Sequence, residues 1–148
     1  MKIICQPLGD VQANCYIIID GENALLIDPG DDYTHLETIL KDNHAKLKAV
    51  LLTHAHFDHI AGLDKIVDLY HTDVYCNPKE IEFLSNAHLN GSQFFYRHIT
   101  SSAHPIGVKE GWQNIGGFEV KAYFLPGHSI GSTAYQIGNN LFTGDILS

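Results

Sequence analysis

The run Thr53-His54-Ala55-His56-Phe57-Asp58-His59 carries the strongest signal in this chain, because three histidines and one aspartate occupy defined places within it. The apolar run from Lys48 to Leu52 is typical of a short buried strand, so the histidine run begins where a strand ends. Histidine is the commonest metal ligand, and four such polar side chains would be costly to bury together without a metal. The run therefore predicts a metal site at the end of a strand.

The spacing within this run assigns ligands to two positions. His54 and His56 lie two residues apart at the strand end, so their imidazoles project to one side and suit two ligands of one tetrahedral zinc ion. Asp58 and His59 follow where the chain turns into the next helix, and we expect them at a second position. We also assign Asp58 as the catalytic residue.

Four further polar groups also lie directly after predicted strands. Residues at one edge of the sheets of a layered fold meet in space although they are distant in sequence, so we place them at the same site: Asp28, Thr53, His128 after Pro126-Gly127, and Asp145 after Gly144. A carboxylate can bridge two metal ions about 3.5–4 Å apart, and Asp145 is our candidate bridge. Thr53 is expected to contact the metal ligands and orient them without binding the metal itself. Asp28 either does the same or caps the turn before Pro29 and Gly30.

The remaining pattern alternates short strands with amphipathic helices, without repeats or linkers, and 148 residues suit one domain, 1–148. We expect a loop that includes some helix over 85–111. The regular elements expected elsewhere are a hairpin over 14–20 and 24–30, helices over 34–43 and 60–70, a strand over 74–76, a helix from Pro78 through Leu84, a strand over 118–125, and a hairpin over 133–137 and 141–143.

The composition limits the partners and the compartment. The formal net charge is −8, and the nine Lys and Arg residues form no basic stripe, so nucleic acid is not expected to bind. The N-terminal apolar run is too short for a signal peptide and no run is long enough to span a membrane, so we expect a cytoplasmic protein. The three cysteines, Cys5, Cys15 and Cys76, lack C-x-x-C spacing and are expected as buried or half-buried free thiols.

Five motifs together resemble, in order and spacing, the glyoxalase II-like (hydroxyacylglutathione hydrolase-like) branch of the metallo-β-lactamase superfamily. They are Asn14-Cys15-Tyr16, Asp28-Pro29-Gly30, the run 53–59, Pro126-Gly127-His128-Ser129 with Gly131-Ser132, and Thr143-Gly144-Asp145. The resemblance implies an α+β protein with the four-layered αββα fold. It also implies two divalent metal ions, Zn²⁺ first and iron as the alternative: His54, His56 and His128 hold the first, Asp58 and His59 the second, and Asp145 bridges them.

The resemblance also implies a departure at the C-terminus. The family continues beyond its Gly-Asp strand with another αβ portion, which supplies a last histidine to the second metal, whereas this sequence ends at Ser148. We expect either a fragment, a chain completed by a partner or by another copy of itself, or a shortened relative. An uncovered apolar face would favour self-association, and a monodisperse monomer in light scattering would contradict this expectation.

Three functions remain open from the sequence. The resemblance implies a metallo-hydrolase that cleaves a thioester or similar small acyl substrate through attack by a metal-bound hydroxide. A persulfide dioxygenase-like oxidoreductase is the alternative, with one iron held by His54, His128 and Asp145. The third is an inactive metal-binding fragment. Nuclease and β-lactamase activities fit less well, because there is no basic groove and no export signal.

Overall fold

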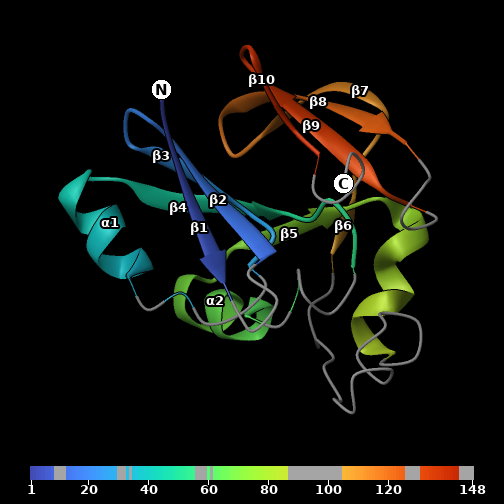
Figure 1. Cartoon of the computed structure of the whole chain (residues 1–148), viewed down its shortest axis with the longest axis horizontal. Coiled ribbons are helices and arrows are strands. Elements are labelled where there is room, and N and C mark those ends of the chain that lie inside the picture. The colour runs from blue at the N-terminus through green and yellow to red at the C-terminus, as the bar shows by residue number, and fades with distance from the viewer. Residues whose placement is uncertain are drawn as a thin grey trace.

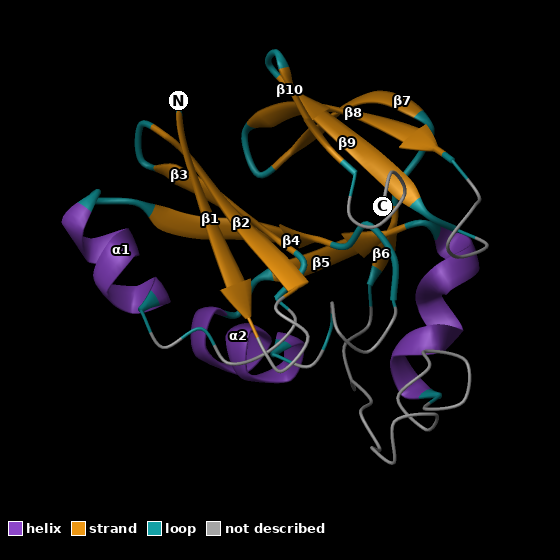
Figure 2. Cartoon of the chain, viewed as in Figure 1, coloured by secondary structure: helices purple, strands orange, loops and turns teal. Residues whose placement is uncertain are grey.

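Two β-sheets lie face to face, and helices cover the outer face of the larger one (Figures 1 and 2). This arrangement comes from a computed structural model, which describes residues 1–8, 13–29, 33, 35–55, 60, 62–86, 105–125 and 131–143.

The larger sheet has six strands that neighbour one another in chain order. They are β1 (Lys2–Leu8), β2 (Ala13–Asp20), β3 (Asn23–Ile27), β4 (Lys46–Leu51), β5 (Asp73–Cys76) and β6 (Ile106–Gly107). The first three strands pair antiparallel and the next three join in parallel. The predicted hairpin is confirmed as β2 and β3, with Gly21 in the left-handed region at its turn (φ 60°). Strand β1 was not predicted, because its side chains are mostly exposed and give no clear burial pattern.

The smaller sheet has four antiparallel strands in the order β10-β9-β8-β7. They are β7 (Gly111–Ile115), β8 (Phe118–Phe124), β9 (Thr133–Ile137) and β10 (Asn140–Phe142). The predicted strand over 118–125 and the predicted hairpin after it are both confirmed. The predicted loop over 85–111 is wrong at its two ends, where the last residue of η2, strand β6 and the first residue of β7 lie, and its middle part, 87–104, falls outside the described residues. Trp112 and Asn114 of β7 are exposed, so this edge strand shows little apolar periodicity.

Three helices complete the described part: α1 (Leu36–Asp42), α2 (Leu63–Tyr70) and the 3₁₀ helix η2 (Pro78–Ser85). Each falls inside or against its predicted range, and Pro78 begins η2 as expected, since its fixed φ and missing N–H suit a first helical position. Helix α2 is capped by His71, which adopts the left-handed conformation (φ 49°) and donates its backbone N–H to Val67 O at 2.8 Å.

The core has two layers, one on each face of the six-stranded sheet. Ile17 and Ile19 of β2 face α1 and α2, where they pack with Leu36, Leu63 and other apolar residues. Ile18, between them in the chain, faces the four-stranded sheet and packs with residues such as Val120 and Tyr135. This alternation follows from the period of two along a strand. The helix–sheet–sheet order agrees with the predicted αββα fold, and the predicted fold class is confirmed.

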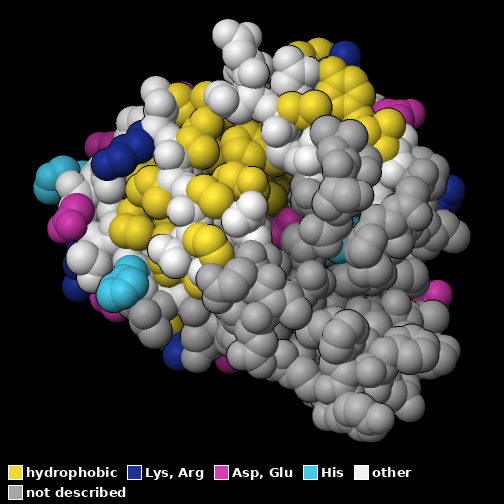
Figure 3. Space-filling model, viewed as in Figure 1, with side chains coloured by type: hydrophobic (Ala, Val, Ile, Leu, Met, Phe, Trp, Pro, Cys, Tyr) yellow, Lys and Arg dark blue, Asp and Glu magenta, His cyan; other side chains and the backbone are white. Residues whose placement is uncertain are grey.

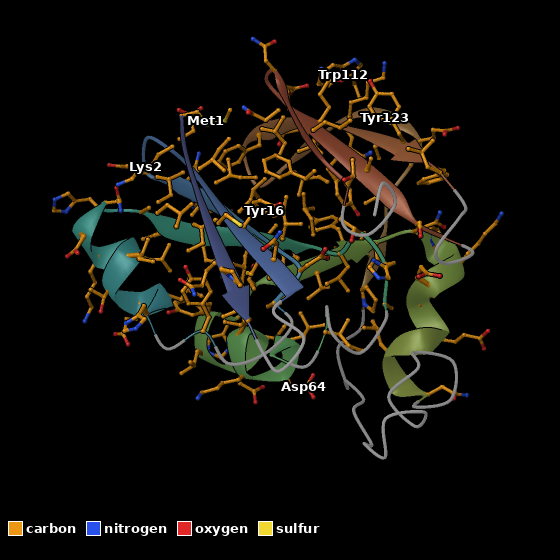
Figure 4. All side chains as sticks on the ribbon, viewed as in Figure 1. Met1, Lys2, Tyr16, Asp64, Trp112 and Tyr123 are labelled. Carbon is orange, nitrogen blue, oxygen red and sulfur yellow. The ribbon has the colours of Figure 1, made fainter. Side chains whose placement is uncertain are left out.

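Some apolar surface stays exposed. Trp112 and Tyr123 lie on the four-stranded sheet (Figure 4), and Lys121 Nζ lies 5.8 Å and 4.9 Å from their ring centroids. Hydrophobic side chains also gather over β1 and β2 (Figure 3), where Met1 and Ile3 are exposed. Within the described residues, no helix has the length and apolar character that crossing a membrane requires.

Candidate metal centre

One of the six predicted metal ligands lies within the described residues. It is His54, which follows the end of β4 and is 1% exposed. The other predicted ligands, His56, Asp58, His59, His128 and Asp145, lie outside the described residues. Among the residues that are described, no three His, Cys, Asp or Glu side chains form a group that could hold a metal ion. The geometry therefore informs on His54 and on the residues that surround it.

The parallel pairing of β3 and β4 brings Asp28 beside Thr53. Both strands end at the same edge of the sheet, and Asp28 N donates to Leu51 O at 3.1 Å just beyond the last paired residues. Asp28 adopts the left-handed conformation (φ 57°), which aspartate tolerates better than most residues. Its buried carboxylate accepts two hydrogen bonds from Thr53, from the backbone N at 2.8 Å and from Oγ1 at 2.6 Å.

These contacts assign the tautomer of His54. Thr53 Oγ1 has one proton, and it donates this proton to Asp28 Oδ2. The same oxygen lies 3.0 Å from His54 Nδ1, so it must accept there, and Nδ1 carries the ring proton. The lone pair of the neutral imidazole is then on Nε2. Asp28 and Thr53 therefore orient His54 and prepare Nε2 as an acceptor.

The backbone that precedes His54 is held by the second sheet. Leu52 O accepts a hydrogen bond from the buried Tyr135 hydroxyl at 2.7 Å, and Thr53 O accepts one from Thr133 N at 2.8 Å. Both donors belong to β9 of the four-stranded sheet. Leu52 N in turn donates to Tyr75 O at 2.9 Å, so His54 follows a segment that is fixed to both sheets.

A buried glutamate lies beside the same segment. Glu80 of η2 is 0% exposed, and its Oε1 accepts a hydrogen bond from Ala55 N at 3.1 Å. Its Oε2 accepts one from Gly131 N, also at 3.1 Å. Sequence reasoning missed Glu80, because a single glutamate in a short helix carries no local signal of what it contacts. The structure alone brings it to the histidine run.

This arrangement fits a metal ion. Histidines that bind metals in proteins typically donate the other ring N–H to an oxygen, which fixes the tautomer and the ring orientation, and His54 does so through Thr53. Buried polar side chains are uncommon unless they are paired or bind metal, and Asp28, Thr53 and His54 are each 1% exposed. The predicted donor set of imidazoles and carboxylates also suits Zn²⁺ or iron.

Other cysteine and histidine predictions are partly corrected. Cys15 and Cys76 are buried free thiols as expected, whereas Cys5 is exposed on the outermost strand β1. His35, His44 and His71 lie on the surface as predicted. The same prediction for His88, His98 and His104 falls outside the described residues. Burial raises the pKa of the Cys76 thiol to about 12, and the Glu80 carboxylate adds to the shift.

Proteins of known sequence match almost the whole chain. The "Probable metallo-hydrolase YqgX" of Bacillus subtilis is 37% identical over 152 residues, which is 99% of this chain and 72% of that protein. The "Probable polyketide biosynthesis zinc-dependent hydrolase BaeB" of Bacillus velezensis is 32% identical over 136 residues. That match covers 90% of this chain, which spans about half the length of BaeB, 54%.

Solved structures match the fold as well. The BLEG-1 B3 metallo-beta-lactamase superimposes with a TM-score of 0.90 and 38% identity over 99% of this chain and 73% of its own. TTHA1623 in a di-iron-bound form gives a TM-score of 0.81 and 31% identity over 96% of this chain and 71% of its own. A model of the metallo-beta-lactamase superfamily matches residues 8–148, which include the histidine run and every strand of both sheets except most of β1. With sequence, fold and the surroundings of His54 in agreement, the chain belongs to the metallo-beta-lactamase superfamily.

Proposed function

We propose that this chain is a metal-dependent hydrolase that acts on a thioester or a similar activated acyl compound of small size. At the level of the class it is a metallo-hydrolase, as its relative YqgX is named. The observation that carries the proposal is the buried Asp28–Thr53–His54 arrangement, which sets the His54 tautomer required of a metal ligand.

The proposed metal site combines this arrangement with the ligands from the sequence. We propose two divalent ions, with His54, His56 and His128 on the first, Asp58 and His59 on the second, and Asp145 between them. When bound, such ions lower the pKa of water toward about 7 and stabilise the oxyanion of an attacked carbonyl group. BaeB is named as zinc-dependent, and TTHA1623 has been seen with two irons, so we propose Zn²⁺ first and iron as the alternative.

Each described residue has its own part in this proposal. The Asp28 carboxylate accepts hydrogen bonds from the Thr53 hydroxyl and backbone N, and Thr53 Oγ1 accepts a hydrogen bond from His54 Nδ1. The Tyr135 hydroxyl and Thr133 N then hold the backbone before His54. A ligand held this way loses little conformational entropy when a metal binds, which favours tight binding. We propose Asp58 as the catalytic residue, on the sequence pattern alone.

The proposed specificity for thioesters rests on the glyoxalase II-like motifs. The assays below therefore compare thioesters with another class of acyl substrate. The alternative hypothesis, a persulfide dioxygenase-like oxidoreductase, requires a single iron rather than two metal ions. Cytoplasmic location, a small-molecule substrate, no nucleic-acid binding and self-association stay predictions from the sequence.

The test begins with elemental analysis of the purified, unchelated chain, followed by assays on a glutathione thioester, a simple acyl thioester and a β-lactam. We expect near two equivalents of Zn²⁺ or a similar divalent ion per chain, and thioester cleavage that is lost on chelation. One equivalent of iron would shift the proposal to oxygen chemistry. A chain without metal would contradict both readings.

Two histidine variants provide the matched comparison. His54→Ala removes the buried predicted ligand, and His35→Ala removes an exposed histidine at the start of α1. We expect His54→Ala to lose most of the bound metal and at least about 100-fold in activity, whereas His35→Ala keeps both. Equal metal content in the two variants would remove His54 from the site.

A further inference from the structure

The Glu80 carboxyl group joins two loops that come from different sheets. Ala55 follows β4 of the six-stranded sheet, and Gly131 precedes β9 of the four-stranded sheet. One oxygen of Glu80 accepts the backbone N–H of Ala55 and the other accepts that of Gly131, each at 3.1 Å. Figure 1 shows η2, which carries Glu80, at the end of the molecule toward which β5 runs.

The surroundings of Glu80 are built to bring the carboxyl group to this place. Asn77 starts the turn, because its Oδ1 accepts from Lys79 N at 2.9 Å and its backbone O accepts from Glu80 N at 2.9 Å. Residue 131 must be small, since a Cβ there would lie 2.7 Å from Glu80 Cγ and 3.1 Å from Asn77 Cγ. The absence of a side chain at Gly131 therefore lets the Glu80 carboxyl group approach the backbone N–H of Gly131.

Glu80 is fully buried, and the burial of a carboxyl group must be compensated by other interactions. A carboxyl group taken out of water costs several kcal/mol unless hydrogen bonds compensate, and apolar packing would fill the same space at lower cost. Both Glu80 oxygens accept backbone N–H groups from segments that lie 25 and 51 residues away in the chain. The contacts therefore fix one loop relative to the other, which an apolar side chain could not do.

The two loops are those on which the proposed metal site depends. Ala55 is the residue between His54 and His56, and Gly131 follows His128 by three positions. Asp28 and Thr53 hold His54 through its ring, whereas Glu80 holds the peptide group that follows it. We infer that Glu80 is a positioning residue that sets the distance between the two ligand loops, and so raises the affinity of the metal site without touching metal or substrate. This inference rests on the metal site of the proposed function.

The test measures metal affinity rather than activity. Glu80→Gln keeps the size of the side chain but turns an NH₂ group toward one of the two backbone N–H donors, so one loop loses its acceptor. In the 148-residue chain we expect Zn²⁺ affinity, measured by competition with a chromophoric chelator, to fall about 10–100-fold. The visible absorption spectrum of bound Co²⁺ should change as well, because it reports ligand geometry.

A core variant separates positioning from general stability. Val120→Ala removes buried volume between the two sheets, in strand β8, where Val120 pairs with Gln113 and Ile137. It should destabilise the fold and leave Zn²⁺ affinity and the Co²⁺ spectrum unchanged. Gly131→Ala is the second test of the loop contact, because its Cβ would displace the Glu80 side chain while the carboxyl group stays in the chain. It should weaken Zn²⁺ binding in the same direction, including in the case where Glu80→Gln does not fold.

The outcomes distinguish the two proposals. Zn²⁺ affinity and a Co²⁺ spectrum equal to those of the unsubstituted chain in both Glu80→Gln and Gly131→Ala would overturn the role of Glu80 and leave the metal site standing. An equal loss of affinity in Val120→Ala would also overturn it, because destabilisation alone would then explain the effect. An unsubstituted chain that binds no Zn²⁺ or Co²⁺ would overturn the proposed function and, with it, this inference.

Discussion

At Asp28, an unfavourable backbone conformation and a buried carboxylate are offset by hydrogen bonds. Its backbone adopts a left-handed conformation that costs most residues about 1–2 kcal/mol, and its carboxylate is buried. Two hydrogen bonds from Thr53 offset these costs, and they leave Thr53 Oγ1 as an acceptor toward His54. Of the two roles considered from the sequence, the contacts favour support of the histidine.

Substitution of Thr53 tests the contacts that join Asp28, Thr53 and His54. Thr53→Val keeps the shape but removes the hydroxyl, so Asp28 Oδ2 and His54 Nδ1 both lose a buried partner. We expect the free energy of unfolding to fall by about 1–3 kcal/mol in urea titrations and Zn²⁺ to bind about tenfold more weakly. Thr53→Ser is the control, since it keeps the hydroxyl and should retain most of both. If valine and serine gave the same Zn²⁺ affinity, the hydroxyl would have no part in orienting His54.

At the scale of elements, the helices and strands owe their positions to apolar stripes. Helix α2 turns Leu63 and Ile66 toward the six-stranded sheet and leaves Leu69 63% exposed. The stripe was visible in the sequence as a helical period, which is why α1 and α2 were predicted. Edge strands β1 and β7 were missed, because an exposed strand is held mainly by backbone hydrogen bonds that any sequence can make.

Two leucines of α2 provide the element-scale test. Leu63→Ala opens a cavity beneath the helix, and we expect the free energy of unfolding to fall by about 2–5 kcal/mol. Leu69→Ala removes the same atoms from an exposed position and should change it by no more than about 0.5 kcal/mol. Chemical denaturation of both variants checks the difference, and similar losses would mean that α2 does not pack on the sheet as described.

Across the whole molecule, the two core layers bury groups that would ionise in the unfolded chain. Cys15 and Cys76 lie in the layer beneath the helices and Tyr135 lies between the sheets. Burial raises the pKa of all three, with smaller contributions from neighbouring acidic groups. Each group therefore stays neutral in the folded state at pH values where it loses its proton after unfolding.

This difference predicts a loss of stability in alkali. The stabilisation from Cys76 is fully present below its ordinary pKa of 9.0 and is lost as the pH rises toward its folded pKa of about 12. In that interval each such group should lower the free energy of unfolding by about 1.4 kcal/mol per pH unit. Denaturant titrations from pH 8 to 11 measure the slope, and Cys76→Ala should reduce it by the share of one group. An unchanged slope in that variant would show that Cys76 ionises equally in both states.

The amino-acid sequence by itself determined the regular elements with a strong period, because periodicity is a local property. Its motifs implied the αββα class only through their resemblance to a known family, and the metal-binding role of the run after β4 stays a prediction from the ligand spacing. The tertiary structure alone decided how His54 is held. Three hydrogen bonds show this, because each joins residues that are distant in the sequence. The separation is 25 residues for Thr53 and Asp28, 51 for Gly131 and Glu80, and 83 for Leu52 and Tyr135. Such contacts depend on which strand ends share an edge of a sheet and on how the two sheets pack, and no local pattern encodes them.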